Sequence, residues 1–190
     1  MPYQVPALTP EQQAAWRVLD RVWDVMINGD GAALAKLERE IESFPHGTDP
    51  ALERHWLTNA VDAGAISAVM WMVGRGVELS YVDDEGYTPL ISALHVDEPN
   101  KRHEIMRLLL AAGSRHDLIG LNRWTAAHIA ASIGDTEALQ LLREFGADLC
   151  VCTEDLGSWC TPEQLAKLNK HAAARAYLQG VCGGAEHRVT

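Results

Sequence analysis

Features that would indicate a membrane-spanning or exported protein are missing from this sequence. Its most apolar stretch, residues 63–73, is too short to span a bilayer, which needs about 20 residues. The first ten residues carry no Lys or Arg and no long apolar run, so they are not typical of a secretory signal. We therefore expect a soluble, cytoplasmic protein that does not bind membranes.

Signatures of catalysis are missing as well. The sequence contains no phosphate-binding glycine loop, no His-Glu-x-x-His pair and no nucleophile elbow around a serine. These patterns place reactive side chains or phosphate-binding backbone groups in the geometry that their chemistry needs. Without them, we predict that the protein is not an enzyme and uses no cofactor.

Cysteine is scarce, with four residues in the chain. In a reducing cytosol, Cys150, Cys152, Cys160 and Cys182 should be free thiols. The spacing of the first three differs from the paired two-residue knuckle of a structural zinc site. We expect small buried side chains and no bound metal. A metal or enzymatic site formed by Cys150, Cys152, Cys160 and a histidine is the alternative.

Positive charge is scarce in the first hundred residues, which hold 6 Lys and Arg against 16 Asp and Glu. The rest of the chain is balanced, so the formal net charge of −10 arises entirely in the first part. Such acidity disfavours binding to nucleic-acid phosphates. The segment between Arg75 and Lys101 has no base at all, and it is either a solvated face or an attractive surface for a basic partner. Its acids are Glu78, Asp83, Asp84, Glu85, Asp97 and Glu98.

Internal repetition is the most informative feature that is present. The chain has 190 residues, of which 47% are hydrophobic and 22% charged. This length and hydrophobic content are enough to form a globular core. Thr88, Thr125 and Thr161 lie 37 and 36 residues apart in similar sequence contexts. Gly76 and Gly113 each precede the next of these threonines by 12 residues. The repeating unit therefore keeps one register through the middle of the chain.

The repeats resemble ankyrin repeats. The best match, residues 124–148, contains Thr125, His128, Ala130, Ala131, Gly134, Leu141, Leu142, Gly146, Ala147 and Asp148. An earlier, degenerate copy carries His55-Trp56 in place of Thr-Pro. The resemblance implies an all-α solenoid of stacked helix-turn-helix units with short β-turn fingers. It places a single domain of about five copies at residues 11–180, between an N-terminal extension (1–10) and a C-terminal tail (181–190).

Local sequence signals agree with this architecture. Thr-Pro pairs at 9–10, 88–89 and 161–162 are typical of helix starts, since Thr caps free N–H groups and Pro needs no donor there. Gly76, Gly113 and Gly146 are typical of left-handed helix ends. Residues 96–101 form an insertion in which Pro99-Asn100 predicts a turn. Trp16 and Trp23 share one helix face and are expected to pack in the core or cap, and Trp71 in the core.

The resemblance also implies roles for single residues. His128 occupies the slot whose ring hydrogen-bonds between neighbouring repeats. Tyr87 and Trp124 directly precede the repeat threonine, and Trp159 lies close to the same slot. In the family this slot lies on the fingers and commonly faces the ligand, where Trp and Tyr are favoured binding anchors. The alternative is that each ring packs on its neighbouring finger.

Together these observations predict a module that binds and inhibits one protein partner. The family hosts recognition far more often than chemistry, and an acidic all-repeat chain of this size resembles bacterial immunity proteins that neutralise a basic toxin. The alternative is a scaffold or regulatory subunit, or a host-directed effector, that recruits an enzyme. We expect a monomer in the free state. The predicted partner-binding residues are Asp83, Asp84, Glu85, Tyr87, His95, Asp97, Glu98, Asn122, Trp124 and Trp159.

Overall fold

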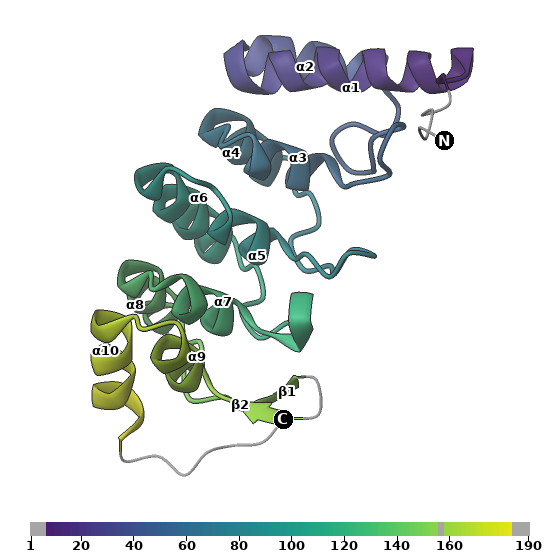
Figure 1. The fold of residues 1–190 in the computed structure, drawn as a ribbon. Coiled ribbons are helices and arrows are strands. Elements are labelled where there is room, and N and C mark those ends of the chain that lie inside the picture. Colours follow the sequence, from purple (N-terminus) through teal and green to yellow (C-terminus); the bar gives the residue numbers. More distant parts are fainter. Residues whose placement is uncertain (1–6, 156–157, 184–190) are drawn as a thin grey trace, which may run out of the picture. The chain divides into compact units, whose positions relative to one another are not determined.

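The computed structural model describes residues 7–155 and 158–183, with side chains for residues 7–153 and 160–183. Over these residues the chain forms helices and one short β-hairpin (Figure 1). It divides into two compact units, Met1–Val77 and Glu78–Thr190. The boundaries of the predicted single domain, 11–180, stay a prediction.

The Met1–Val77 unit contains two helix pairs. The first pair is α1 (Pro10–Asn28) with α2 (Gly31–Glu40), and the second is α3 (Trp56–Asp62) with α4 (Ile66–Gly74). Helix α1 also packs on α3, and α2 packs on α4, so their apolar faces share one core. The large side chains buried in this core are Met26, Leu34, Leu37, Trp56, Leu57 and Met72.

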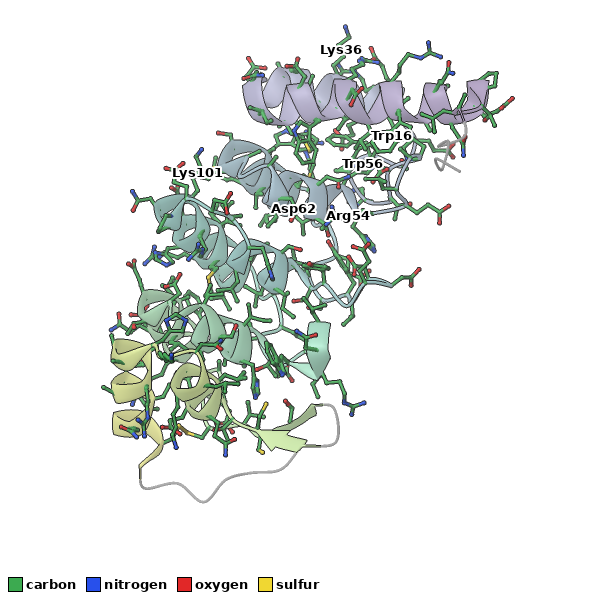
Figure 2. All side chains as sticks on the ribbon, in the orientation of Figure 1. Trp16, Lys36, Arg54, Trp56, Asp62 and Lys101 are labelled. Carbon is green, nitrogen blue, oxygen red and sulfur yellow. A yellow bond between two sulfur atoms is a disulfide. The ribbon has the colours of Figure 1, made fainter. Side chains whose placement is uncertain are left out.

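A long loop joins the two pairs of this unit, and buried polar contacts hold it. Asp49 is 1% exposed and accepts hydrogen bonds from the backbone N–H groups of Ala51 and Leu52, at 2.9 and 2.6 Å. Arg54, just before α3, pairs with Asp62 at the end of that helix across 2.6 Å (Figure 2). The loop is therefore held by hydrogen bonds inside it and by an ion pair to α3 at its C-terminal end.

The Glu78–Thr190 unit contains three helix pairs in succession (Figure 1). First helices pack on the next first helix and second helices on the next second helix, as α5–α7–α9 and α6–α8–α10. The loops before α5 and α7 and the β-hairpin before α9 project from the same side of the stack. We call these three projections fingers 1, 2 and 3. The helices are α5 (Pro89–Leu94), α6 (Pro99–Ala111), α7 (Ala126–Ile133), α8 (Thr136–Glu144), α9 (Pro162–Leu168) and α10 (Ala172–Cys182).

Short elements shape fingers 2 and 3. A 3₁₀ turn, η1 (Leu121–Arg123), lies in finger 2. Finger 3 is the antiparallel hairpin of β1 (Thr153–Asp155) and β2 (Ser158–Cys160). The predicted helical solenoid of stacked helix-turn-helix units with β-turn fingers is confirmed within the units.

The predicted helix starts and ends are confirmed. The hydroxyl groups of Thr9, Thr88 and Thr161 accept the backbone N–H three residues later at 3.1–3.3 Å. The glycines after α4, α6 and α8 have positive φ angles of 71°, 94° and 88°, as a left-handed helix end requires. One local prediction was wrong: Pro99 and Asn100 do not form a turn but begin α6, because Pro fits the first helical position.

The expectation of four free thiols was also wrong. Cys150 and Cys182 form a disulfide, with their Cα atoms 5.6 Å apart. Cys152 is buried and its pKa is raised by burial, while Cys160 is half-buried. The disulfide ties the end of α10 to the chain just before finger 3.

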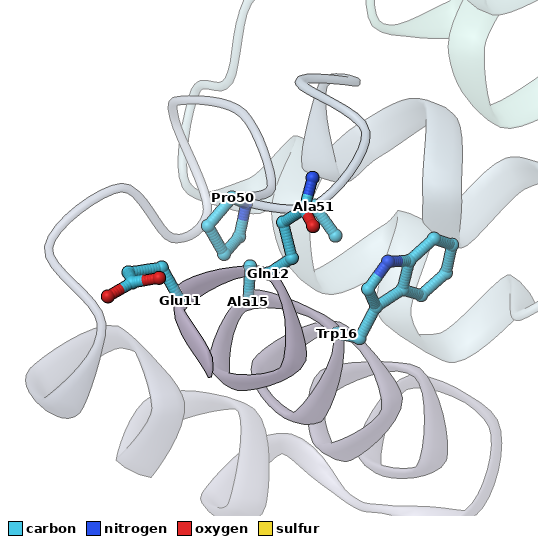
Figure 3. A pocket seen from close by; sticks show the side chains of 6 residues that line it. All are labelled: Glu11, Gln12, Ala15, Trp16, Pro50 and Ala51. Atoms are coloured by element: carbon cyan, nitrogen blue, oxygen red, sulfur yellow. The ribbon is translucent and has the colours of Figure 1, made fainter. Parts of the chain in front are cut away.

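Two tryptophans of the Met1–Val77 unit are less buried than expected. Trp16 is 37% exposed and borders a hollow of about 240 Å³ between the start of α1 and the loop at Pro50 (Figure 3). Trp71 is half-buried, between the ring of Phe44 at 5.9 Å and the guanidinium of Arg75 at 4.4 Å. Both rings lie at the margin of the core, where one edge stays open to solvent.

Candidate functional site

Finger 1 presents two acids at its tip. Asp83 donates its backbone N–H to the carbonyl of Tyr87 at 2.9 Å, and its carboxylate accepts the N–H of Glu85 at 3.1 Å and of Tyr87 at 2.7 Å. The carboxylate of Asp83 is therefore used to close the turn. Asp84 and Glu85 are exposed, and both point their charge to solvent.

Finger 2 is held against finger 1 by close backbone contact, since the N–H of Leu121 donates to the carbonyl of Gly86 at 2.6 Å. Within finger 2, the N–H of Gly120 donates to the carbonyl of Trp124 at 2.9 Å. A Cβ on Gly86 would lie 2.9 Å from the nitrogen of Leu121, and φ at this glycine is +86°. Only glycine therefore fits this junction. The exposed Asn122 sits at the tip of finger 2, also with positive φ.

Two of the predicted aromatic anchors have described side chains, and both are half-buried. The ring of Tyr87 packs edge-to-face on the ring of His95, with centroids 5.4 Å apart. His95 is exposed, and its Nδ1 lies 2.8 Å from the carbonyl oxygen of Ile91. The indole Nε1 of Trp124 is buried without a hydrogen-bond partner among the described residues. Trp159 lies in β2, where its backbone pairs with Glu154, but its side chain is outside the described residues.

The predicted acids beyond finger 1 lie in the short loop between α5 and α6. Asp97 and Glu98 are both exposed. Glu98 forms an ion pair with Lys101 at 3.0 Å, so part of its charge is compensated. Of the predicted site residues, Tyr87 and His95 are therefore in contact, whereas the Asp83 carboxylate bonds within its own turn. Among the described residues, the polar partners of these acids lie within their own segments, as at Asp83 in finger 1 and at Glu98 beside Lys101.

Two exposed apolar residues were missed by the sequence analysis. Val82 on finger 1 is 45% exposed and Ile119 on finger 2 is 42% exposed. Each precedes its repeat threonine by six residues, so both occupy the same repeat position. This register was visible in the sequence and could have identified them. They add apolar surface beside the acids and aromatics of the fingers.

His128 connects neighbouring repeats, as its position implied. The ring is fully buried, and its Nδ1 accepts from the hydroxyl of Thr125 at 2.9 Å. Its Nε2 donates to the carbonyl of Cys160 at 3.3 Å. These contacts join α7 to the end of finger 3, which makes His128 a structural residue rather than a site residue.

A buried ionic cluster joins α6 to α8 on the side away from the fingers. Asp135, whose side chain is 8% exposed, pairs with Arg102 at 2.6 Å and with His103 at 2.9 Å, and it caps α8 through the N–H of Ala138. Burial alone would raise the pKa of Asp135. The Ala138 N–H, Arg102 and His103 outweigh this effect and lower that pKa below its usual value.

This cluster predicts acid sensitivity of the Glu78–Thr190 unit. At neutral pH, Asp135→Asn should reduce the free energy of unfolding by about 1–3 kcal/mol, because charge-assisted hydrogen bonds are lost. Since the folded-state pKa of Asp135 is depressed, its contribution is present above the unfolded-state pKa and is lost as pH falls through the folded-state value. Urea unfolding from pH 7 to pH 2.5 should therefore show the wild type and the variant converging in acid.

The matched control is Glu144→Gln, an exposed acid on the same helix α8. This variant should follow the wild-type stability within about 0.5 kcal/mol at every pH. A gap between wild type and Asp135→Asn that stays constant down to pH 2.5 would contradict the assigned role of the charge.

The described part of the chain contains no group of three or more His, Cys, Asp or Glu side chains placed to hold a metal ion. None of its helices is long and apolar enough to cross a membrane. The alternative metal site at Cys150, Cys152 and Cys160 also loses one thiolate, because Cys150 is in the disulfide.

Comparison with known families gives one result. A family model for ankyrin repeats, in three copies, matches residues 55–152, about half of the chain. No curated protein matches the sequence. The matched range includes fingers 1 and 2 and the helices that carry them.

Proposed function

This chain belongs to the ankyrin-repeat family, whose repeats form protein–protein interaction modules, and we propose that it binds one protein partner through its fingers and inhibits it. The family is generally non-catalytic, and we propose that this member is non-catalytic too. The contact surface would comprise the predicted residues of fingers 1 and 2 and the loop at Asp97 and Glu98. Trp159 on finger 3 would extend it.

The composition of finger 1 carries this proposal. Asp84 and Glu85 are exposed at its tip, with exposed Val82 and half-buried Tyr87 beside them. Acids around an apolar and aromatic centre favour a partner that is basic at its rim and apolar at its core.

The most specific form of the proposal is an immunity protein that neutralises a basic bacterial toxin. Acids on a finger would mimic the phosphates that such a toxin binds and would accelerate association. The test is co-expression with the product of the neighbouring gene. If no neighbouring gene encodes a protein that is toxic alone and rescued by this chain, the immunity role is wrong, and recruitment of an enzyme without inhibition becomes the favoured function.

Location is part of the same proposal. A cytoplasmic site was expected from the sequence, whereas a disulfide such as Cys150–Cys182 is typical of oxidising compartments. We propose that the disulfide forms in the cell, either because the protein acts in an oxidising compartment or because an oxidant reaches it before it binds its partner. Labelling of free thiols in the protein taken from its native cells tests this: two free thiols are expected if the disulfide is formed, and four in a reducing cytosol.

Charge reversal on finger 1 should weaken partner binding strongly. The double variant Asp84→Lys with Glu85→Lys places two like charges against a basic partner, and we expect an affinity about 100-fold lower. The association rate should fall, and its dependence on salt should flatten or reverse, because attractive steering is lost. Surface plasmon resonance at several salt concentrations measures both effects.

The control carries the same change in net charge at another place. Glu104→Lys with Glu144→Lys alters exposed acids on α6 and α8, outside the fingers. This variant should keep the affinity within about threefold, because its charges lie further from the partner than finger 1 does. Equal losses for the two double variants would show a general charge effect and would remove finger 1 from the proposed site.

A further inference from the structure

A small cavity lies at the base of finger 2, and none of its lining residues is among the predicted partner-binding residues. Its volume is about 240 Å³. This is below the range of roughly 300–1,000 Å³ that is usual for drug-sized ligands, and it suits one inserted side chain. Its walls are the base of finger 2 itself and the chain just before finger 3. The lining residues are His116, Asp117, Ile119, Thr125, Asp148 and Val151.

The lining combines two carboxylates with an apolar surface. Asp117 and Asp148 are both exposed at the cavity, and Ile119 is 42% exposed beside them. Arg115 donates to both carboxylate oxygens of Asp117, at 3.0 and 2.9 Å, and Asp148 accepts the N–H of Cys150 at 2.8 Å. An ionised carboxylate has about four acceptor positions, so each of the two acids retains capacity for a further donor.

The cavity walls are fixed before any ligand arrives. Ser114, at the start of the first wall, is buried and donates its hydroxyl to the carbonyl of Leu79 at 2.8 Å. Thr125 is 4% exposed and directly precedes α7. In the second wall, Leu149 is 2% exposed and Cys150 is held by the disulfide to α10. A preorganised cavity binds with little additional ordering cost.

We propose that this cavity receives an arginine side chain of the protein partner. The inference rests on the proposed function for the identity of the partner, but its chemistry comes from the lining. A guanidinium has five donors in a planar fork that suits carboxylate acceptors such as Asp117 and Asp148, while a lysine ammonium acts as a single point charge. The aliphatic part of the arginine side chain would lie on Ile119 and Val151. Ile119 also makes the cavity continuous with the exposed side of finger 2.

Small probes test the site without the partner. N-acetyl-arginine methylamide, titrated into the ¹⁵N-labelled protein at low salt, should shift the backbone amide signals of Ile119, Thr125 and Val151 with millimolar affinity. N-acetyl-citrulline methylamide has the same shape without the charge and should shift them at least about tenfold less at equal concentration. Equal shifts from both probes, or shifts at other residues only, would overturn the arginine site.

A double substitution localises the effect. Asp117→Asn with Asp148→Asn keeps the side-chain shapes and an oxygen acceptor for the N–H of Cys150, so the fold should be retained. Arginine binding should weaken at least about tenfold. The matched control, Glu104→Gln with Glu144→Gln, removes two exposed acids outside the fingers and should leave binding of the probe unchanged. If the control weakens binding as much as the cavity variant, general acidity rather than the cavity binds arginine, and the proposal fails.

Failure of this test is distinguishable from failure of the proposed function. Loss of the arginine site would leave the effect of Asp84→Lys with Glu85→Lys on partner affinity intact. Conversely, the probe reports on the cavity whether or not finger 1 contributes to partner binding. In the complex with an identified partner, the cavity variant should weaken binding at least about tenfold beyond its control, and an unchanged affinity would overturn the assignment to a partner arginine.

Discussion

Replacing Cys150 and Cys182 together with serine should lower the free energy of unfolding of the Glu78–Thr190 unit by about 3–4 kcal/mol. The disulfide closes a loop with a sequence separation of 32 residues, which restricts the unfolded chain. In the folded unit it ties α10 to the chain before finger 3. Without it, α10 is held by Ala174 and Leu178, both fully buried, and by the ion pair between Arg175 and Glu163 at 2.7 Å.

Urea unfolding with and without a reductant measures this effect. Reduced wild type should match the Cys150→Ser with Cys182→Ser variant, and the variant should not respond to reductant. Hydrogen exchange should accelerate first in α10, because terminal repeats of a stacked array depend on one neighbour only. Cys160→Ser is the control: it keeps the disulfide, so its stability should still fall on reduction.

Identical unfolding of the oxidised and reduced wild type would show that the disulfide contributes nothing to stability. A loss of the expected size would instead make the fold depend on an oxidising environment at physiological temperature. The capping helix α10 and the wall of the arginine cavity at Cys150 would then be weakened by the same reduction, so binding of the arginine probe should fall in parallel.

The sequence predicted best those features that depend on a few adjacent residues. A threonine followed by proline begins a helix at Thr9, Thr88 and Thr161, because the capping bond forms within four residues. The resemblance to ankyrin repeats, placed on the sequence by the repeat register, then implied the finger positions and the structural role of His128. The candidate site follows the same logic, since Tyr87 and Trp124 were chosen by their position before a repeat threonine.

Features that depend on distant residues could not be predicted in the same way. The pairing of Cys150 with Cys182 requires α10 to return to the start of finger 3, which no local pattern states. Asp83 was predicted as a binding acid, yet its carboxylate closes its own turn. The arginine cavity is formed by residues about thirty positions apart, and neither wall alone has an unusual sequence. Pro99 was ambiguous locally, because proline suits both a turn and a first helical turn.

Replacing the buried Asp49 with alanine should destabilise the Met1–Val77 unit by about 3–5 kcal/mol. Its carboxylate accepts the N–H groups of Ala51, Leu52 and Arg54, the last at 3.2 Å, and the side-chain amide of Asn59 at 3.0 Å. Alanine leaves all four donors without their acceptor, and buried donors are costly to leave unpaired. Urea unfolding, with hydrogen exchange of α3 as a local measure, detects the loss.

Asp49→Asn separates the hydrogen bonds from the charge and should cost much less, about 1–2 kcal/mol. The new amide oxygen can still accept from Ala51 and Leu52. Its NH₂ group needs an acceptor, and the Oδ1 of Asn59 is buried without a partner among the described residues, so rotation of the Asn59 amide can pair the two side chains. The exposed acid Asp20 provides the control, since Asp20→Ala should change stability by less than about 0.5 kcal/mol. Equal losses for Asp49→Ala and Asp49→Asn would mean that the negative charge, rather than the acceptor geometry, holds this loop.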